Sequence, residues 1–368
     1  MARLFMTQRL CQFEEATLHA LINQTMTHRH QQYPNPCVGA MVILDNQTVS
    51  EGFHTQSGHP HAEVIALELA GNQATGATLL ITLEPCCHTG KTTPCVDAII
   101  ASGIARVIWA IDDPNPLVTG KSKAILESHG IAVVDHVMPD LGRAIIKEFD
   151  AFHRLKRPYI YVKAAISLDG YIAPNRHQLH YISNQQTLDV VQAMRCHVQA
   201  ICVGESTIRI DQPRLSIRTF PVNTQPMIVI LDPHNRVDTQ WLNRTLDTNR
   251  CIHVFRTKPL QICHSQLHVH DGLLENKTEN WRYVFKTLYS LNVQGVLIEG
   301  GSGIFDSILG AQLFDELWIT RVPDVFASKT AVPFIQQAKT PLNLQLTSTK
   351  ALGNDVLTIY TNTHAVYL

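Results

Sequence analysis

The sequence reads GHPHAEVIAL at residues 58–67 and TLEPCCHTGKTTPC at residues 82–95. The apolar spacing that follows Pro60 predicts a helix, because proline is favoured in the first helical turn. The β-branched run ATLLITL at residues 77–83 predicts a buried strand, and a second helix is expected to begin at Cys95. This order of helix, strand and helix predicts an α/β domain with histidine and cysteine side chains at the ends of its elements.

Three residues of this stretch, His61, Cys86 and Cys95, are of the types that hold zinc in proteins. One imidazole and two thiolates leave a fourth coordination position open for a water molecule, whose pKa falls on binding. Cys95 is expected at a helix N-terminus, where the helix dipole favours a thiolate. Glu63 is predicted to take the proton from that water and return it to a substrate ring nitrogen and the departing ammonia. H-x-E followed by P-C-x-x-C is the pattern of zinc deaminases, although here eight residues separate the two cysteines.

A structural zinc site and a set of buried cysteines are the alternatives to a catalytic zinc site. A closed structural site needs a fourth protein ligand. Cys87 is the nearest candidate, but its immediate neighbour Cys86 is already a ligand, which makes its geometry poor. The arrangement therefore favours a catalytic zinc site, and Cys37 is predicted to be a thiol of the core.

The rest of the chain predicts two α/β domains joined by a helix. Strands and helices alternate through residues 1–139, which indicates a three-layer α/β domain. Residues 140–157 are predicted to form a helical linker that ends before Pro158. Residues 158–368 begin with a strand and end with paired strands, so a second α/β domain with a mixed sheet is expected.

Composition narrows the class of protein further. A length of 368 residues corresponds to about two domains. Thirty Lys and Arg balance 31 Asp and Glu, so no basic excess indicates nucleic-acid binding. The N-terminus lacks the apolar run of a signal peptide, no apolar stretch is long enough to span a bilayer, and the nine cysteines are scattered along the chain. We therefore expect a cytoplasmic protein with no membrane or nucleic-acid partner.

Eight motifs spread over both halves of the chain resemble those of one enzyme family. In the first half they are PNPCVGAMV (34–42), GHPHAEVIAL (58–67), TLEPCCHTGKTTPC (82–95) and DDPNPLVTGK (112–121). In the second half, where the match is looser, they are VKAAISLDGYIA (162–173), DQPRLSIR (211–218), LDPHNRV (231–237) and LIEGGSGIF (297–305). The chain is thus similar to the bifunctional riboflavin-biosynthesis enzymes, in which a pyrimidine deaminase is fused to a pyrimidine reductase. The long loop between the two cysteines is itself a mark of this family.

The resemblance implies a fold and a reaction for each domain. The first domain, with a cytidine-deaminase-like fold and one zinc ion, would act on 2,5-diamino-6-ribosylamino-4(3H)-pyrimidinone 5′-phosphate and release an amino group as ammonia. The second domain, with a dihydrofolate-reductase-like fold, would use NADPH to reduce the ribosyl group of the product to ribityl. Enzymes of this family commonly self-associate, so a homodimer or homotetramer is expected.

The resemblance also implies substrate-binding residues in the deaminase domain. They are Asn35, His54, His88, Lys91 and Thr92. Lys91 and the backbone N–H groups of its loop are suited to a phosphate group. Without the zinc pattern, each of these residues would be assigned as an ordinary turn, strand-edge or solvent-exposed residue.

In the reductase domain, the glycine turn that precedes a predicted helix would present backbone N–H groups to a phosphate of NADPH. By resemblance, the cofactor-binding residues are Ala165, Tyr181, Thr207, Asp211, Gly301, Ser302, Gly303 and Ile304. The substrate-binding residues are Lys163, Leu179, Arg195, Leu215, Arg218 and Glu299. Arg195 and Arg218 are chemically suited to phosphate, although either could equally be an ordinary solvated residue.

Three positions of the second half depart from the family pattern. Tyr181 replaces a usual tryptophan, which keeps a smaller stacking face. Gln212 replaces the second aspartate of an Asp-Asp-Pro sequence, and Tyr171 replaces a usual basic residue. Since Asp211 is retained, we expect the reductase domain to be active.

Two alternatives stay open on the sequence. A nucleic-acid deaminase that acts on adenosine in tRNA shares the zinc pattern, but it would not account for the second domain. A zinc-stabilised binding protein with an inactive reductase-like domain predicts a closed zinc site and no effect of Glu63→Gln on function.

Overall fold

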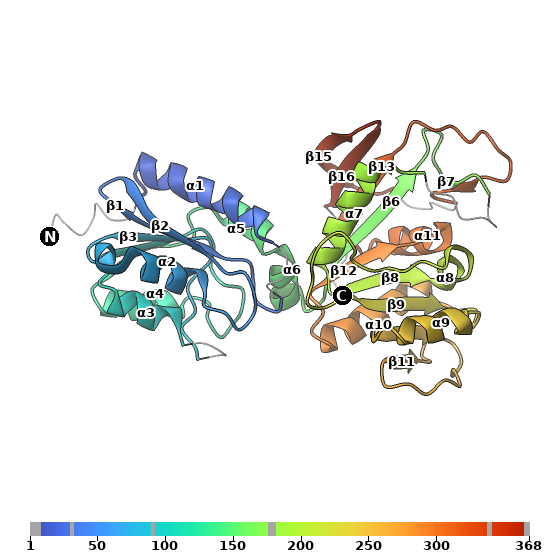
Figure 1. Cartoon of the computed structure of the whole chain (residues 1–368), viewed down its shortest axis with the longest axis horizontal. Helices are drawn as coiled ribbons and strands as arrows, with labels where there is room; N and C mark the ends of the chain where they lie inside the picture. The colour runs from blue at the N-terminus through green and yellow to red at the C-terminus, as the bar shows by residue number, and fades with distance from the viewer. Residues whose placement is uncertain (1–8, 30–32, 90–92, 176–181, 337–340, 364–368) are drawn as a thin grey trace. The chain divides into compact units, whose positions relative to one another are not determined.

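The computed structural model describes residues 9–29, 33–89, 93–175, 182–336 and 341–363. The chain divides into two compact units, Met1–Arg154 and Leu155–Leu368, each with its own sheet and helices (Figure 1). Both units are of the α/β class, as the sequence predicts. Among the described residues, every helix is too short or too polar to cross a lipid bilayer.

The first unit is built on a five-stranded mixed sheet. Its strands are β1 (Gly39–Leu44), β2 (Gln47–Phe53), β3 (Thr78–Ile81), β4 (Arg106–Trp109) and β5 (Ala132–Val134). They lie in the order β2-β1-β3-β4-β5. Strand β1 is antiparallel to β2 and β3, whereas β3, β4 and β5 are mutually parallel. The loops that follow β3 and β4 therefore meet at one edge of the sheet, where ligands of α/β proteins bind.

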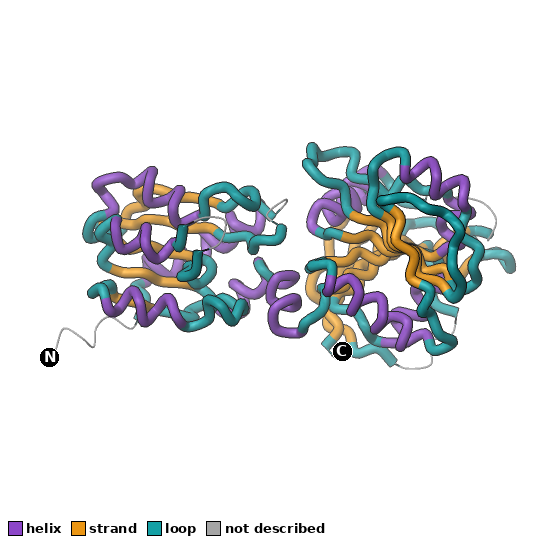
Figure 2. Tube along the Cα trace, turned by 90° about the horizontal axis from the view of Figure 1, so that it is seen from below, coloured by secondary structure: helices purple, strands orange, loops and turns teal. Residues whose placement is uncertain are grey.

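Helices cover both faces of this sheet, which gives the three layers predicted (Figure 2). They are α1 (Gln12–Thr27), α2 (Ala62–Ala70), α3 (Cys95–Ala101), α4 (Lys121–Ser128), α5 (Pro139–Ile145) and α6 (Lys147–Asp150), with a 3-10 turn at Gly71–Ala74 and a π-helical turn at Ala151–Leu155. Successive strand residues point to opposite faces. Val42 and Leu79 pack with α2, α3 and α4, whereas Met41 and Leu80 pack with α1 and α5.

The segment between the two sheets is helical but not continuous. The boundary between the compact units falls between Arg154 and Leu155, within the residues 140–157 expected to form a linker. Ile145 and Phe149, from this segment, are buried in the core of the first unit together with α1. Much of the segment therefore packs as part of the first unit.

The second unit is built on a nine-stranded sheet. Its strands are β6 (Tyr159–Ile166), β8 (Ala200–Gly204), β9 (Met227–Asp232), β10 (Ile252–Arg256), β11 (Leu267–His270), β12 (Gly295–Glu299), β13 (Glu316–Arg321), β15 (Leu344–Leu352) and β16 (Asp355–Asn362). They lie in the order β11-β10-β9-β8-β12-β6-β13-β16-β15. The strands from β11 to β13 are parallel, and β16 and β15 add an antiparallel ribbon, so the sheet is mixed as predicted. A separate pair, β7 (Tyr171–Ala173) and β14 (Val332–Pro333), forms a small second sheet.

Five helices flank this sheet within the described residues. They are α7 (Gln185–His197), α8 (Glu205–Asp211), α9 (Thr239–Leu246), α10 (Lys277–Ser290) and α11 (Ser302–Ala311). Trp281 of α10 and Phe305 of α11 are buried on one face, and Met194 of α7 and Trp241 of α9 are buried on the other. Helices α8, α9 and α10 are not predicted from the sequence.

Candidate functional site

The three predicted zinc ligands converge in the first unit. His61 is the N-cap residue of α2, and its Nδ1 lies 3.1 Å from Cys95 Sγ and 3.5 Å from Cys86 Sγ. The ligand atoms of the three residues all lie within 4.8 Å of one another. The structure thus brings together one histidine and two cysteines, although His61 and Cys95 are 34 positions apart in the sequence.

Local structure explains how the eight-residue gap between the cysteines is closed. Cys86 follows β3, and Cys95 is the first residue of α3. The Cys95 N–H donates to Cys86 Sγ at 3.3 Å, and the Val96 N–H donates to the Cys86 carbonyl at 3.2 Å. The Ser122 hydroxyl also donates to the Pro85 carbonyl at 2.6 Å. These bonds hold the first cysteine over the start of α3, so the loop between the cysteines can be long.

The donor set fits a zinc ion. Hydrogen bonds from Cys95 and His61 lower the pKa of Cys86 to about 4, so one thiolate is present before metal binds. The same interaction with Cys86, together with burial, raises the pKa of Cys95. Cys86 and Cys95 therefore share one proton, and a metal cation that binds both sulfur atoms would displace it.

The zinc site has three protein ligands within the described part of the chain, which leaves a fourth coordination position. Cys87, the candidate for a closed site, is not in the cluster, and its Sγ lies 3.9 Å from the Leu117 carbonyl oxygen. Cys37 is buried and donates to the Thr25 carbonyl at 3.4 Å, and burial raises its pKa to about 12. It is a core thiol, as predicted.

Glu63 lies in the first turn of α2, beside the same site. It is 3% exposed, and it lines a cavity of about 220 Å³ together with His61 and Cys86. Burial raises the pKa of the Glu63 carboxyl above its usual value. A carboxyl with a raised pKa beside the candidate zinc ligands is suited to accept and return a proton.

Three of the predicted substrate-binding residues line this cavity. Asn35 Nδ2 donates to His54 Nε2 at 3.1 Å, and His54 Nδ1 then donates to the Pro60 carbonyl at 3.1 Å. Burial lowers the pKa of His54, which keeps the ring neutral. His88 also lines the cavity, and its Nδ1 is buried without a hydrogen-bond partner among the described residues. Lys91 and Thr92 lie outside the described residues.

Two further residues of the cavity are missed by the sequence analysis. Asp113 and Asn115 line it, and the Asn115 N–H donates to the Asp113 carboxyl at 2.8 Å. Burial raises the pKa of Asp113 to about 7. Both lie in the DDPNPLVTGK motif, where acidic and amide side chains after an apolar strand are a usable signal.

Glu84 holds this loop in position. Its carboxylate accepts the backbone N–H groups of Asp113 at 3.3 Å, Gly120 at 3.1 Å and Ser122 at 3.3 Å. A buried carboxylate that accepts several N–H groups orders the loop around it. The loop after β4 is therefore tied to the end of β3, beside the cysteines.

A second cavity, of about 1040 Å³, lies in the second unit. It is lined by six of the predicted cofactor-binding residues, namely Thr207, Asp211, Gly301, Ser302, Gly303 and Ile304. Gly301 is the N-cap of α11, so the first backbone N–H groups of this helix face the cavity without partners inside the helix. Ala165 lies on β6 and is not among the lining residues, and Tyr181 lies outside the described residues.

Small side chains keep this helix start open, which fits a phosphate-bearing cofactor. A Cβ added at Gly303 would meet nothing within 4 Å, and one at Gly301 would meet only Thr207 Oγ1 at 3.9 Å. A Cβ at Gly300 would come within 3.1 Å of Ile304. The backbone can thus approach a ligand closely at this turn.

Three of the predicted substrate-binding residues of the second unit, Lys163, Arg195 and Glu299, form a charged group outside that cavity. Arg195 donates Nε and Nη2 to the Glu299 carboxylate, each at 2.8 Å, and Nη1 to the Ser216 carbonyl at 3.0 Å. Lys163 and Glu299 are register partners on β6 and β12, and burial lowers the pKa of the Lys163 ammonium. The Arg195 guanidinium is therefore already held by protein groups, so its role toward a phosphate stays a prediction.

The remaining predicted substrate residues lie in or near the segment after α8. Leu215 is buried and adopts a left-handed φ of 49°. The Arg218 N–H donates to Gln192 Oε1 at 2.7 Å, and its side chain is exposed. Leu179 lies outside the described residues.

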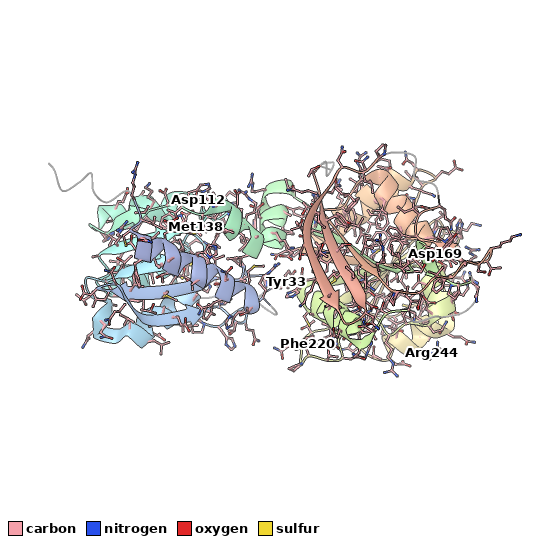
Figure 3. All side chains as sticks on the ribbon, turned by 90° about the horizontal axis from the view of Figure 1, so that it is seen from above. Tyr33, Asp112, Met138, Asp169, Phe220 and Arg244 are labelled. Carbon is pink, nitrogen blue, oxygen red and sulfur yellow. The ribbon has the colours of Figure 1, made fainter. Side chains whose placement is uncertain are left out.

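Gln212, one of the departures from the family pattern, links two helices. It ends α8 with a left-handed φ of 46°, and its Nε2 donates to Asp238 Oδ2 at 2.7 Å. Arg244 of α9, labelled in Figure 3, donates to Gln212 Oε1. The amide thus makes contacts to both an acid and a base, which a carboxylate could not. Asp211 faces the cavity, and burial raises the pKa of its carboxyl.

Comparisons with known proteins cover both units. Residues 13–111 match the cytidine and deoxycytidylate deaminase zinc-binding region, and residues 158–358 match the RibD C-terminal domain. The riboflavin biosynthesis protein RibD of Aquifex aeolicus is 34% identical over 89% of this chain and 92% of the relative. That of Bacillus amyloliquefaciens is 35% identical over 93% and 95%, respectively.

Solved structures show the same architecture. Acinetobacter baumannii RibD superimposes with a TM-score of 0.86 at 28% identity and covers 95% of this chain and 99% of that one. A diaminohydroxyphosphoribosylaminopyrimidine deaminase/5-amino-6-(5-phosphoribosylamino)uracil reductase of Thermotoga maritima superimposes with a TM-score of 0.82 at 29% identity, over 95% and 99%. The matched reductase domain leaves no support for the tRNA deaminase alternative.

Proposed function

The chain belongs to the RibD family of riboflavin-biosynthesis deaminase/reductases, and on this basis we propose how its two cavities divide the two reactions. The deaminase would occupy residues 1–139 and the reductase residues 158–368. The Thermotoga maritima relative is named for a ribosylaminopyrimidine phosphate substrate. We infer the same substrate class here, with loss of an amino group as ammonia followed by NADPH-dependent reduction of the ribosyl group to ribityl.

The observation that carries the deaminase assignment is the meeting of Glu63 with His61, Cys86 and Cys95 at one cavity. A zinc ion held by the histidine and the two cysteines would lower the pKa of a water molecule. Glu63 accepts one proton of the attacking water at its carboxylate and passes it to the ring nitrogen. It then carries the second proton of that water, released as the carbonyl forms, to the leaving amine. Its raised pKa favours uptake of the proton.

Other groups of the cavity orient the pyrimidine. The Asn35–His54 hydrogen bond holds the neutral imidazole with one fixed tautomer. His88 Nδ1 has no hydrogen-bond partner among the described residues, and the Asp113 carboxyl, which accepts the Asn115 N–H, also lines the cavity, so both are placed to pair with polar atoms of the ring or sugar. Lys91 and Thr92 remain proposed substrate-binding residues, and the Lys91 ammonium is suited to the phosphate.

In the reductase unit, the proposed NADPH site is the 1040 Å³ cavity at the start of α11. The backbone N–H groups of Ser302 and Gly303 are suited to a pyrophosphate, and Thr207 and Asp211 supply polar side chains from α8. Lys163, Arg195, Leu215, Arg218, Glu299 and Leu179 are the proposed substrate residues, and Ala165 and Tyr181 complete the proposed cofactor set.

Glu63→Gln tests the assignment directly. The amide keeps the shape of the side chain but cannot accept the proton, so we expect ammonia release to fall by at least about 100-fold. Zinc should stay bound, because Glu63 is not a ligand, and NADPH oxidation should be normal when the deaminated product is supplied. Ammonia and NADPH are measured in the same reaction with the full chain.

Retention of near-normal ammonia release by this variant would contradict the role of Glu63. Glu68→Gln, on the exposed side of the same helix, is the matched control and should behave as the unmodified protein. With the diaminopyrimidinone substrate, NADPH consumption by the unmodified protein would show that both domains are active. Ammonia release without NADPH consumption would place the fault in the reductase domain.

We also propose that the protein acts in the cytoplasm as a homodimer or homotetramer. All nine cysteines are free thiols, which suits a reducing compartment, and NADPH is an intracellular reductant. Family resemblance supports self-association. Light scattering on the purified chain gives the oligomeric state. A monomeric mass at working concentration would contradict the proposed self-association.

A further inference from the structure

A second group of side chains that could bind a metal ion lies in the reductase unit. Cys251 directly precedes β10, His253 lies on β10, and His268 lies on β11. Their ligand atoms all lie within 4.8 Å of one another. We refer to these three residues as the edge cluster, because β11 is the outermost strand of the nine-stranded sheet.

Strand geometry places the three side chains on one face. Residues two apart in an extended segment point the same way, so Cys251, just before β10, lies on the same face of the sheet as His253. His253 and His268 are register partners in the parallel pair of β10 and β11, and their rings stack with centroids 4.6 Å apart. The convergence therefore follows from the backbone register and not from a chance approach of long side chains.

The distances are close to those of a tetrahedral metal site. Cys251 Sγ lies 3.3 Å from His253 Nε2. Ligand atoms around one zinc ion are separated by roughly 3.3–3.8 Å, given the usual metal–sulfur and metal–nitrogen bond lengths. His268 is exposed, and its side chain makes no hydrogen bond within the described part of the chain, so a change of rotamer can bring its ring nitrogen to the same ion.

A fourth residue orients the buried ligand. His253 Nδ1 lies 3.0 Å from His270 Nε2, and the His270 ring stacks on Phe255 with centroids 4.3 Å apart. A proton on His253 Nδ1 that is donated to His270 leaves the lone pair on Nε2, which faces Cys251. Metal-binding histidines commonly have such a partner on the other ring nitrogen.

Electrostatics suit a cation at this position. Burial and the neighbouring rings of His268 and His270 lower the pKa of His253 to about 3, so this imidazole is a neutral ligand. Burial raises the pKa of the Cys251 thiol when no metal is bound. A divalent cation would offset the cost of a half-buried thiolate at Cys251, and the thiol proton would pass to solvent.

We propose that Cys251, His253 and His268 bind a second transition-metal ion of the zinc class, with a water molecule as the fourth ligand. A thiolate with two imidazoles is the ligand chemistry that selects zinc over magnesium or calcium. The edge cluster does not line the 1040 Å³ cavity, so the ion lies outside the proposed NADPH site. It ties β11, a strand of only four residues, to β10 at an otherwise open sheet edge.

Metal analysis of the full-length protein tests the proposal. After chelator treatment and reloading with zinc, we expect about two ions per chain, one at each cluster. His268→Ala removes an exposed side chain and should lower the count to about one without affecting ammonia release. His264→Ala is the matched control and should keep about two ions per chain. His264 is an exposed histidine four residues before His268, and its Nδ1 accepts the Gln266 N–H.

Cobalt substitution gives an independent readout. In a background that carries both Cys86→Ser and Cys95→Ser, the remaining thiolate-to-cobalt absorption should come from Cys251 and disappear on adding Cys251→Ser. The metal-loaded protein should also unfold at a higher temperature than the metal-free protein, by an amount that His268→Ala reduces and His264→Ala does not. One ion per chain in the unmodified protein, or two in His268→Ala, would overturn the proposal.

Discussion

At the scale of single residues, the reductase unit contains a buried ion pair between Arg195 and Glu299. Both partners are mostly shielded from solvent, with side-chain exposures of 9% and 17%. Burial by itself would raise the pKa of the Glu299 carboxyl, but the Arg195 guanidinium holds it below its usual value. Because the folded-state pKa is depressed, the pair stabilises the protein above a pH of about 4.5 and loses this effect as the pH falls through the folded-state pKa.

Glu299→Gln leaves the Arg195 charge buried without its counter-ion. We expect the second unit to lose about 3–5 kcal/mol of stability, together with reductase activity, while ammonia release is retained. Thermal unfolding and the two activity assays measure these effects. In the control Glu279→Gln, an exposed pair with Arg282 is removed, and a change below about 1 kcal/mol is expected. Equal effects of the two variants would show that burial of the first pair has no consequence.

At the scale of elements, the start of α1 depends on one glutamate. Glu14 is 5% exposed and its Oε2 accepts the Cys11 N–H at 2.8 Å, while Cys11 Sγ accepts the Glu14 N–H at 3.5 Å. Its Oε1 accepts Arg106 Nη1 at 2.9 Å, which joins the helix to β4. This side chain therefore both caps the helix and attaches it to the sheet.

Glu14→Ala removes the bond from the Cys11 N–H, which is one half of the capping box, and leaves the Arg106 guanidinium without this partner. A loss of about 1–3 kcal/mol is expected, seen as faster hydrogen exchange in α1 and a lower unfolding temperature of the first unit. Glu15→Ala changes an exposed glutamate of the same turn and should have little effect. If both variants exchange at the same rate, the cap is not what holds the helix start.

Sequence patterns identify most elements but not all. Runs such as GVLIE and GAMVIL are recognisable because β-branched and apolar residues mark buried strands locally. Helices α9 and α10 escape prediction, although Asp238 and Asn276 cap their first turns with side-chain hydrogen bonds to backbone N–H groups. An acidic or amide residue before a mostly polar segment is a weak signal, since the same residues also begin turns.

At the scale of the whole molecule, the two units have separate cores. The clusters around β1, β3 and β4 involve only residues of the first unit, and those around β6, β8 and β12 only residues of the second. Each unit therefore buries its own apolar surface, and damage at one active site is expected to leave the other intact.

Cys86→Ser tests this independence. The substitution removes a zinc ligand of the deaminase unit, so bound zinc and ammonia release should both fall, the latter by at least about 100-fold. NADPH oxidation should be unchanged when the deaminated pyrimidine is supplied. Cys196→Ser is the control and should keep both activities. Cys196 is a half-buried thiol that donates to the Gln192 carbonyl at 3.3 Å. Loss of both activities in Cys86→Ser would show that the units depend on one another.

The amino-acid sequence by itself determined the α/β class, the two-domain order, the candidate zinc ligands with Glu63, and the family. These depend on residue type, local periodicity and short spacings, all of which lie along the chain. Only the tertiary structure decided which distant residues share a site. Asp113 joins the deaminase cavity through Glu84, and Cys251 meets His268 through strand register. Such meetings depend on sheet order and packing, which arise from non-local contacts that no local pattern encodes.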